Sequence, residues 1–186
     1  SNALPYDHEV NFSQHNDGSL KMQFKAGNSL FGKKSKAGAF QVYAPGKYKL
    51  AQAGKTEEVE MNQWNFCVLP GDEIDYQWPV NAFVKNEYEL ECHGANGFFR
   101  SFKDAKTLSG LNVKLTVERL NSKIVTGKMI VSLSADSEKN VILTDRYAKE
   151  TKNILVKPGK VSQVLVDTNA FNGWYEVSVT LENNSV

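Results

Sequence analysis

The sequence YELECHGANGFFRSF at residues 88–102 alternates apolar and polar side chains around a central Gly-Ala-Asn-Gly segment. Tyr88, Leu90 and Cys92 alternate with acidic and imidazole side chains, which predicts a strand that buries one face. The segment from Gly94 to Gly97 tolerates positive φ angles, and the aromatic residues after it resume an extended pattern. The stretch therefore predicts a β-hairpin.

A shorter form of this pattern returns near the C-terminus, where residues 173–179 read GWYEVSV. Two more short matches occur in the same order, Lys21-Met22 with Lys128-Met129 and Pro70-Gly71 with Pro158-Gly159. The offset is 107 for the first match, 88 for the second and 87 between Tyr88 and Tyr175. These matches favour a duplication in which the first copy carries an insertion within residues 45–69.

The duplication predicts two domains, residues 4–105 and 106–186, with the boundary inside the polar segment 103–110. No window carries a helical period. We expect strands on both sides of residues 16–19 and at 39–43, 48–51, 64–69, 74–78, 111–117, 129–133, 141–147 and 161–166, and a terminal strand that follows Asn172-Gly173 directly. This spacing is typical of an all-β protein with two tandem immunoglobulin-like β-sandwich domains, although the Cys…Trp…Cys signature of true immunoglobulin domains is absent.

The composition excludes several classes of protein. With 41% hydrophobic residues, a chain of 186 residues can form one large core or two small ones. A net charge of +1 gives no overall field for nucleic acid, and no apolar run is long enough for a membrane-spanning helix. Residues 1–3, Ser-Asn-Ala, resemble the remnant of a cleaved purification tag, so we expect the natural polypeptide to extend further on this side.

Cys67 and Cys92 lack the spacing of a redox pair or of a thiolate metal site. Two cysteines are also too few for a cage of thiolates. Two buried free thiols that behave as small apolar residues are favoured over a disulfide between them.

The three histidines are the candidate catalytic and metal-binding residues. None of His8, His15 and His93 lies in a nucleophile turn, and surface or edge-strand positions are expected for all three. His8 and His15 are seven residues apart and would face opposite sides of one strand, which disfavours a metal site with Glu9 and Asp17. The sequence therefore assigns no catalytic, cofactor or metal residue.

One loop combines an aromatic side chain, Phe31, with three cations, Lys33, Lys34 and Lys36. This mixture suits contact with an anionic membrane or with phospholipid head groups. A solvated loop is the more common meaning of such a pattern, and it is the interpretation favoured by the sequence alone.

Trp64, Tyr76, Trp78 and Trp174 are suited to a surface that binds sugar or choline, because aromatic faces attract C–H groups and quaternary ammonium. The cores of β-sandwiches also use Trp and Tyr. We favour core positions for these four residues.

The motif residues resemble a known family. Tyr88-Glu89-Leu90 followed by Gly94-Ala95-Asn96-Gly97-Phe98-Phe99-Arg100 resembles Tyr-x-Leu-x-x-x-Gly-Pro-Asn-Gly-Phe-x-Arg in the C-terminal domain of bacterial phosphocholine-type phospholipases C, and Ala39–Tyr43 resembles a strand of that domain. In that family the domain occurs twice, and Gly173-Trp174-Tyr175-Glu176 resembles the Gly-Trp-Tyr-Asp of the second copy. Ala95 and Glu176 depart from the family's proline and aspartate, and the family's usual basic, His-containing tail is not matched.

The resemblance implies a non-catalytic accessory module of a secreted or periplasmic enzyme. The parent phospholipases hydrolyse phosphatidylcholine-like lipids in an N-terminal α/β domain related to acid and alkaline phosphatases, so no catalytic residue can be carried over. The resemblance further implies no cofactor, packing on that catalytic domain, and a contribution to lipid or surface engagement in lipid catabolism. The motif residues are then structural or interdomain: Gly94, Asn96, Gly97, Phe98, Arg100, Gly173, Trp174 and Tyr175.

Two hypotheses from other classes stay open. An independent adhesion or carbohydrate-binding module would expose aromatic rings on one face of a sheet. A self-sufficient hydrolase would place His8, His15 or His93 beside a nucleophile in a cleft.

Overall fold

The computed structural model describes residues 4–15, 17–52, 54–104 and 110–182. The described residues form an all-β protein whose only helical turns are short 3-10 segments, and none of these is long or apolar enough to cross a membrane. The chain divides into two compact units, residues 1–109 (unit 1) and 110–186 (unit 2). The predicted tag remnant and the predicted boundary between residues 105 and 106 lie outside the described residues.

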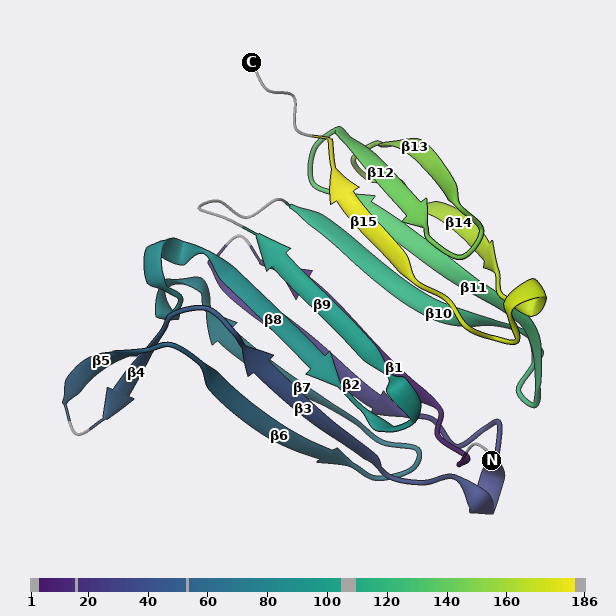
Figure 1. Ribbon diagram of the computed structural model, residues 1–186, viewed down its shortest axis with the longest axis horizontal. Helices are drawn as coiled ribbons and strands as arrows, with labels where there is room; N and C mark the ends of the chain where they lie inside the picture. The colour runs from purple at the N-terminus through teal and green to yellow at the C-terminus, as the bar shows by residue number, and fades with distance from the viewer. Residues whose placement is uncertain (1–3, 16, 53, 105–109, 183–186) are drawn as a thin grey trace. The chain divides into compact units, whose positions relative to one another are not determined.

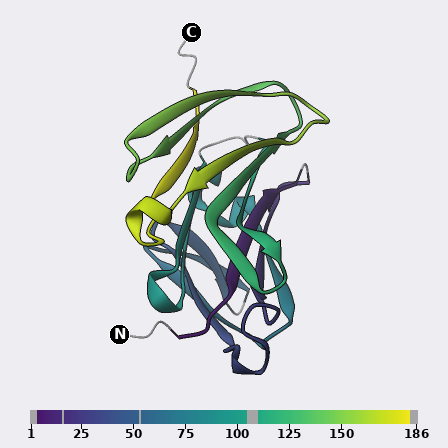
Figure 2. The same cartoon turned by 90° about the vertical axis from the view of Figure 1, so that its right-hand side faces the viewer.

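Unit 1 contains two antiparallel layers of strands (Figures 1 and 2). One layer has the order β1-β2-β7, with β1 at His8–Gln14, β2 at Ser19–Ala26 and β7 at Glu73–Pro79. The other has the order β6-β3-β8-β9, with β6 at Asn62–Val68, β3 at Gly38–Ala44, β8 at Tyr88–His93 and β9 at Phe99–Asp104. A hairpin of β4 (Tyr48–Gln52) and β5 (Lys55–Val59) lies between β3 and β6 in the chain. The 3-10 turns are η1 (Gly32–Lys34), η2 (Val80–Ala82), η3 (Val84–Asn86) and η4 (Ala95–Gly97).

The core of unit 1 follows from the alternation along its strands. Leu20, Met22 and Phe24 of β2 are fully buried, while the residues between them are at least partly exposed. The ring of Phe24 stacks on Phe66 of β6 at 4.5 Å and lies 5.4 Å from Phe40 of β3. The two layers therefore share one apolar core.

Unit 2 also contains two antiparallel layers (Figure 1). One has the order β14-β11-β10, with β14 at Ser162–Asp167, β11 at Ile124–Ala135 and β10 at Leu111–Asn121. The other has the order β13-β12-β15, with β13 at Glu150–Val156, β12 at Lys139–Asp145 and β15 at Val177–Leu181. A 3-10 turn, η5 (Asn169–Phe171), precedes β15. The buried side chains of both layers form a core separate from that of unit 1, and they include Val131, Leu133, Leu143, Val156 and Val166.

The predicted hairpin at residues 88–102 is confirmed as β8 and β9, and the other predicted strands also occur. Two strands, β5 and β13, were not predicted, because both are mostly exposed and polar and so lack an apolar alternation. Two predicted boundaries were wrong. The strand expected to reach Tyr147 ends at Asp145, whose carboxylate accepts hydrogen bonds from the amides of a turn. The C-terminal strand begins at Val177, after a turn at residues 172–176.

Candidate functional site

A tight turn joins β8 to β9. The Gly94 amide donates to the Phe98 carbonyl at 2.9 Å, and the Phe98 amide donates to the Ala95 carbonyl at 3.2 Å. Asn96 and Gly97 have φ angles of 58° and 74°, which Asn and Gly tolerate better than other residues. The Asn96 Nδ2 atom donates to the Leu4 carbonyl at 3.1 Å, so the turn also fixes the N-terminal segment.

His8 packs under this turn in a group of rings. Its ring centroid lies 4.8 Å from Tyr6, 4.9 Å from Phe40 and 5.8 Å from Phe98. A Cβ atom at Gly94 would approach the Nδ1 atom of His8 to 3.4 Å and the side chain of Phe98 to 3.3 Å, which leaves little room for any other residue.

Burial disfavours the charged imidazolium and lowers the pKa of His8, while the Asp7 carboxylate partly opposes that shift. The Nε2 atom of His8 is buried and has no hydrogen-bond partner among the described residues. His8 lies on β1, at the edge of the layer β1-β2-β7, and is half-buried, with its ring packed against Phe40 of the core. His8 lies two residues before Val10 and four before Phe12, which are both buried. This spacing was the signal that could have placed His8 on the inner face of the strand.

Arg100 completes the motif on β9. Its guanidinium carbon lies 4.5 Å from the centroid of the Phe98 ring, a cation–π distance. Its Nη1 atom also donates to the Phe99 carbonyl at 2.7 Å. The structure thus brings Gly94 and Phe98 against His8, and Arg100 against Phe98, in an arrangement that supports packing.

Residues 27–37, the basic loop, connect β2 to β3 at the end of unit 1 where the N-terminal segment lies (Figures 1 and 2). The Gly32 amide donates to the Asn28 carbonyl at 2.7 Å, and the Lys36 amide donates to the Pro5 carbonyl at 3.2 Å. Lys33, Lys34 and Lys36 are exposed, and none of them forms an ion pair within the described part of the chain.

Apolar side chains are exposed near this loop. Phe31 is 37% exposed, and Leu69, in a turn tied to β2 by a hydrogen bond from Gly71 to Ala26, is 63% exposed. Leu4, which accepts the hydrogen bond from Asn96, is 54% exposed. Three cations and three apolar side chains therefore occur on neighbouring segments at this end of unit 1.

The family model described as bacterial phospholipase C, C-terminal domain, matches residues 1–103, which include the β8–β9 turn and the basic loop. The chain belongs to this family. A search of curated proteins gave no match. Among solved structures, red sea bream transglutaminase aligns with 97% of this chain and 31% of its own length, at 7% identity and a TM-score of 0.32, a likeness too weak to carry an argument.

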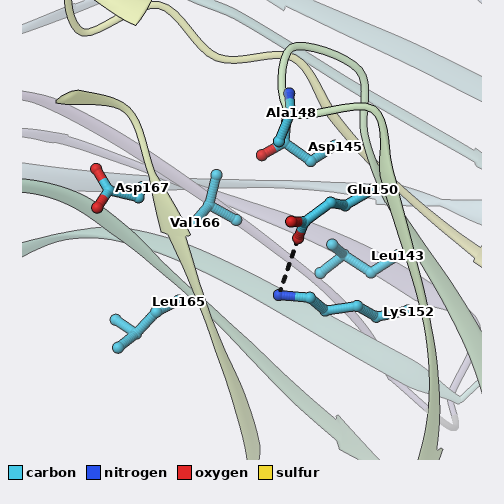
Figure 3. Close-up of a pocket in the computed structure, with 8 residues that line it drawn as sticks. All are labelled: Leu143, Asp145, Ala148, Glu150, Lys152, Leu165, Val166 and Asp167. Carbon is cyan, nitrogen blue, oxygen red and sulfur yellow. Dashed lines mark hydrogen bonds and ion pairs between the residues drawn. The ribbon is translucent and has the colours of Figure 1, made fainter. Parts of the chain in front are cut away.

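In this phospholipase C C-terminal domain the remaining histidines are exposed. The Nε2 atom of His15 lies 3.3 Å from Ser13 Oγ on the surface of β1, and His93 lies 3.6 Å from the carboxylate of Glu91. Neither histidine lines the cavity of unit 2 that is described below (Figure 3). No group of three or more His, Cys, Asp or Glu residues suited to a metal occurs within the described ranges.

Both cysteines of this phospholipase C C-terminal domain are free thiols, but only Cys92 is buried. Burial raises the pKa of Cys92 to about 12. The prediction that Cys67 is also buried was wrong, because Cys67 lies on the outward face of the edge strand β6.

The aromatic residues divide between core and surface. Trp78 is buried and Trp64 packs beside it with ring centroids 5.3 Å apart, as predicted, whereas Tyr76 is 37% exposed. Trp174 is 61% exposed, so its predicted core position was wrong. It lies in the turn before β15, where Gly173 has a φ of 84°, while Tyr175 packs against the core of unit 2.

A cavity of about 180 Å³ lies in unit 2 (Figure 3). It is lined by Leu143, Asp145, Ala148, Glu150, Lys152, Leu165, Val166 and Asp167. Asp145 Oδ1 accepts hydrogen bonds from the amides of Tyr147 and Ala148, and Asp167 Oδ1 accepts two from Asn169. Glu150 pairs with Lys152 at 3.6 Å. The Asp145 and Asp167 carboxylates of this cavity therefore hold two turns in place.

Proposed function

We propose that this chain is a non-catalytic accessory module of a secreted or periplasmic bacterial phospholipase C that hydrolyses phosphatidylcholine-like lipids. The match of the family model to residues 1–103 carries the proposal. The module packs on the N-terminal catalytic domain of the same polypeptide and helps that domain to engage lipid. Under this proposal the β8–β9 motif is structural, in keeping with its hydrogen bonds and ring contacts.

We further propose that the two units are tandem copies of an immunoglobulin-like β-sandwich. The layer β1-β2-β7 has its counterpart in β10-β11-β14, and β6-β3-β8 has its counterpart in β13-β12-β15, with the strands in the same chain order. The β4–β5 hairpin lies inside the predicted insertion at residues 45–69, where unit 2 has only the turn 146–149. The basic loop is a second addition, because only residues 136–138 connect β11 to β12.

The basic loop is the lipid contact that we propose for unit 1. Phe31, Leu4 and Leu69 offer apolar surface, while Lys33, Lys34 and Lys36 supply charge that anionic head groups attract. Each Lys or Arg close to an anionic membrane contributes about 1 kcal/mol to the free energy of binding. The three lysines would therefore strengthen binding, and added salt would weaken their contribution.

Co-sedimentation with vesicles tests this contact. Vesicles of phosphatidylcholine, alone or with phosphatidylserine, are mixed with the purified chain at low and high salt. Changing Lys33, Lys34 and Lys36 to Glu is expected to abolish salt-sensitive binding. Changing Lys47, Lys55 and Lys85 to Glu provides a matched control, because these exposed lysines lie outside the loop. Equal binding by both variants would contradict a lipid contact at the basic loop.

The accessory role is tested in the parent polypeptide. Deleting residues 4–186 is expected to lower hydrolysis of phosphatidylcholine in vesicles far more than hydrolysis of a water-soluble phosphocholine ester, because only the former requires engagement of a lipid surface. An equal loss with both substrates would indicate that the module only buttresses the catalytic domain. Full activity with both would contradict the accessory role.

A further inference from the structure

Two rows of side chains cross the outer face of the layer β6-β3-β8-β9 of unit 1, whose strands lie side by side in Figure 1. Alternate residues of these strands point outward, while most of those between them belong to the core or pack against it. The pairing register puts Asn65, Gln41, His93 and Phe99 in the first row, and Gln63, Tyr43, Glu91 and Ser101 in the second. We name these eight residues the ring face.

Three aromatic rings contact one another on the ring face. The centroid of the His93 ring lies 5.5 Å from that of Tyr43 on β3 and 4.9 Å from that of Phe99 on β9. The side chain of His93 is 46% exposed, Phe99 is 45% exposed and Tyr43 is partly exposed. The rings therefore form a continuous exposed strip over three neighbouring strands.

Uncharged polar side chains flank this strip. Gln63 and Asn65 are exposed on β6, and their side-chain amides form no hydrogen bond with another described residue. The Tyr43 hydroxyl donates to Gln41 Oε1 at 3.3 Å, and the Gln41 Nε2 atom has no partner among the described residues. An amide offers a donor and an acceptor together, and a sugar hydroxyl is both. Rings attract the C–H groups of a sugar, so the ring face supplies both kinds of contact.

The ring face and its surroundings carry little free charge. The Glu91 carboxylate lies 3.6 Å from the neighbouring imidazole. Beside it on the same outer face, Glu89 pairs with Lys103 at 2.8 Å. Beyond the ends of β3 and β6, Lys47 pairs with Glu60 at 3.8 Å. These cations are both paired, so the ring face does not complement an anionic lipid or a nucleic acid.

We propose that the ring face binds a neutral polysaccharide, a function that goes beyond the accessory role and the lipid contact proposed above. A sheet face open to solvent suits an extended sugar chain. A protein partner would need an apolar anchor near the centre of the surface. The centre here is polar, and the apolar ring of Phe99 lies on the edge strand β9. Trp64, which the sequence suggested for a sugar surface, packs on the opposite, inner face of the layer.

The full chain is tested by sedimentation with insoluble cellulose and chitin and by electrophoresis in gels that contain galactomannan or dextran. We expect binding to at least one of these neutral polysaccharides. His93→Ala together with Phe99→Ala is expected to weaken binding about tenfold, because two ring contacts are lost. Gln41→Ala together with Asn65→Ala is expected to weaken it about fivefold, because hydrogen bonds to hydroxyls are lost.

Two matched controls should bind as the unaltered chain does. Gln23→Ala together with Gln77→Ala removes two amides from the outer face of the layer β1-β2-β7. Tyr147→Ala removes a ring that is 43% exposed in unit 2. Equal urea midpoints show that the ring-face variants and the controls are folded.

Cys67 gives a readout that requires no substitution. It is exposed on the same outer face, where it pairs with Ala39 beside the first row, whereas Cys92 is buried. Saturating polysaccharide is expected to slow the alkylation of Cys67 by iodoacetamide. An alkylation rate that the bound polysaccharide leaves unchanged would overturn the proposal.

Three other results would also overturn it. One is binding that neither ring-face variant weakens. Another is no binding to any of the four neutral polysaccharides, which would be the outcome if the ring face contacts a protein instead. The last is binding only to an anionic polysaccharide, alginate, that is lost when Lys33, Lys34 and Lys36 are changed to Glu. That result would assign the binding to the basic loop, which precedes β3.

Discussion

At the residue scale, the β8–β9 turn shows why particular side chains are needed at particular backbone angles. Asn96 and Gly97 both adopt the left-handed conformation, which costs other residues about 1–2 kcal/mol because Cβ approaches the backbone. Asn96 also holds Leu4 through its side-chain amide. The two positions therefore shape the turn, and Asn96 also anchors the N-terminal segment.

Gly97→Ala is expected to lower the free energy of unfolding of unit 1 by about 1 kcal/mol, because alanine at a φ of 74° is strained. Urea unfolding followed by the fluorescence of Trp64 and Trp78 measures the change. Gly46→Ala is the control, since Gly46 does not have a positive φ and a Cβ there meets no atom within 4 Å. A similar loss in both variants would contradict the explanation.

His8 is expected to make the stability of unit 1 depend on pH. Its pKa lies near 6.5 in the unfolded chain and is lower in the folded protein because of burial. Below about pH 6.5 the unfolded state binds more protons, so the contribution of His8 is complete above that pH and is lost as pH falls through the folded pKa.

His8→Phe keeps the ring contacts with Tyr6, Phe40 and Phe98 and removes this titration. The drop in urea midpoint between about pH 7 and about pH 5 should therefore be smaller in this variant than in the unaltered chain. His15→Gln, which changes an exposed histidine, should leave the drop unchanged. If His8→Phe also leaves it unchanged, the inferred pKa shift of His8 is wrong.

At the element scale, the β4–β5 hairpin contributes little to the core. The side chains described along β5 are mostly exposed, and the hairpin meets the core chiefly through Tyr48, whose ring lies 5.2 Å from Trp64 and 5.3 Å from Phe83. A two-stranded hairpin is marginally stable alone, so this contact with unit 1 accounts for its position. The hairpin is an addition to the two layers.

Replacing residues 50–57 by Asn-Gly should shorten the hairpin and change the free energy of unfolding by less than about 1 kcal/mol, since Asn-Gly suits a two-residue turn. Tyr48→Ala should cost about 3 kcal/mol, because it removes the ring contacts with Trp64 and Phe83. Urea unfolding compares the two. A larger loss from the shortened hairpin than from Tyr48→Ala would show that the hairpin is part of the core.

At the scale of the whole molecule, each unit has its own core. Leu90 belongs to the buried cluster of unit 1, and Leu133 belongs to that of unit 2. Both side chains are fully buried, so each substitution by alanine removes a comparable apolar group and leaves a cavity.

Leu90→Ala is expected to lower local stability in unit 1 by about 2–5 kcal/mol, and Leu133→Ala to do the same in unit 2. Hydrogen exchange by mass spectrometry should show faster exchange in β2, β3 and β8 for the first variant and in β11, β12 and β14 for the second. Each variant serves as the control for the other. Equal acceleration in both units by either variant would contradict separate cores.

The sequence alone determined the all-β class, most of the strands, the hairpin at residues 88–102 and the family, because alternation and turn residues are local properties of the chain. It also identified the basic loop as a mixture of cations and one ring. Where a strand is mostly polar, as β5 and β13 are, no local signal marks it, and only pairing with a neighbour makes it a strand.

Only the tertiary structure decided which side chains share a surface. It turned the half-buried ring of His8 toward the core and left Cys67 and Trp174 outside, because burial depends on which layer covers a residue and on where a strand begins. It also brought the turns at residues 119–125, 146–149 and 168–176 to one end of unit 2 through the pairing of strands distant in the chain. The sequence does not show that these turns lie together, because they are far apart along the chain and strand pairing sets the position of each one.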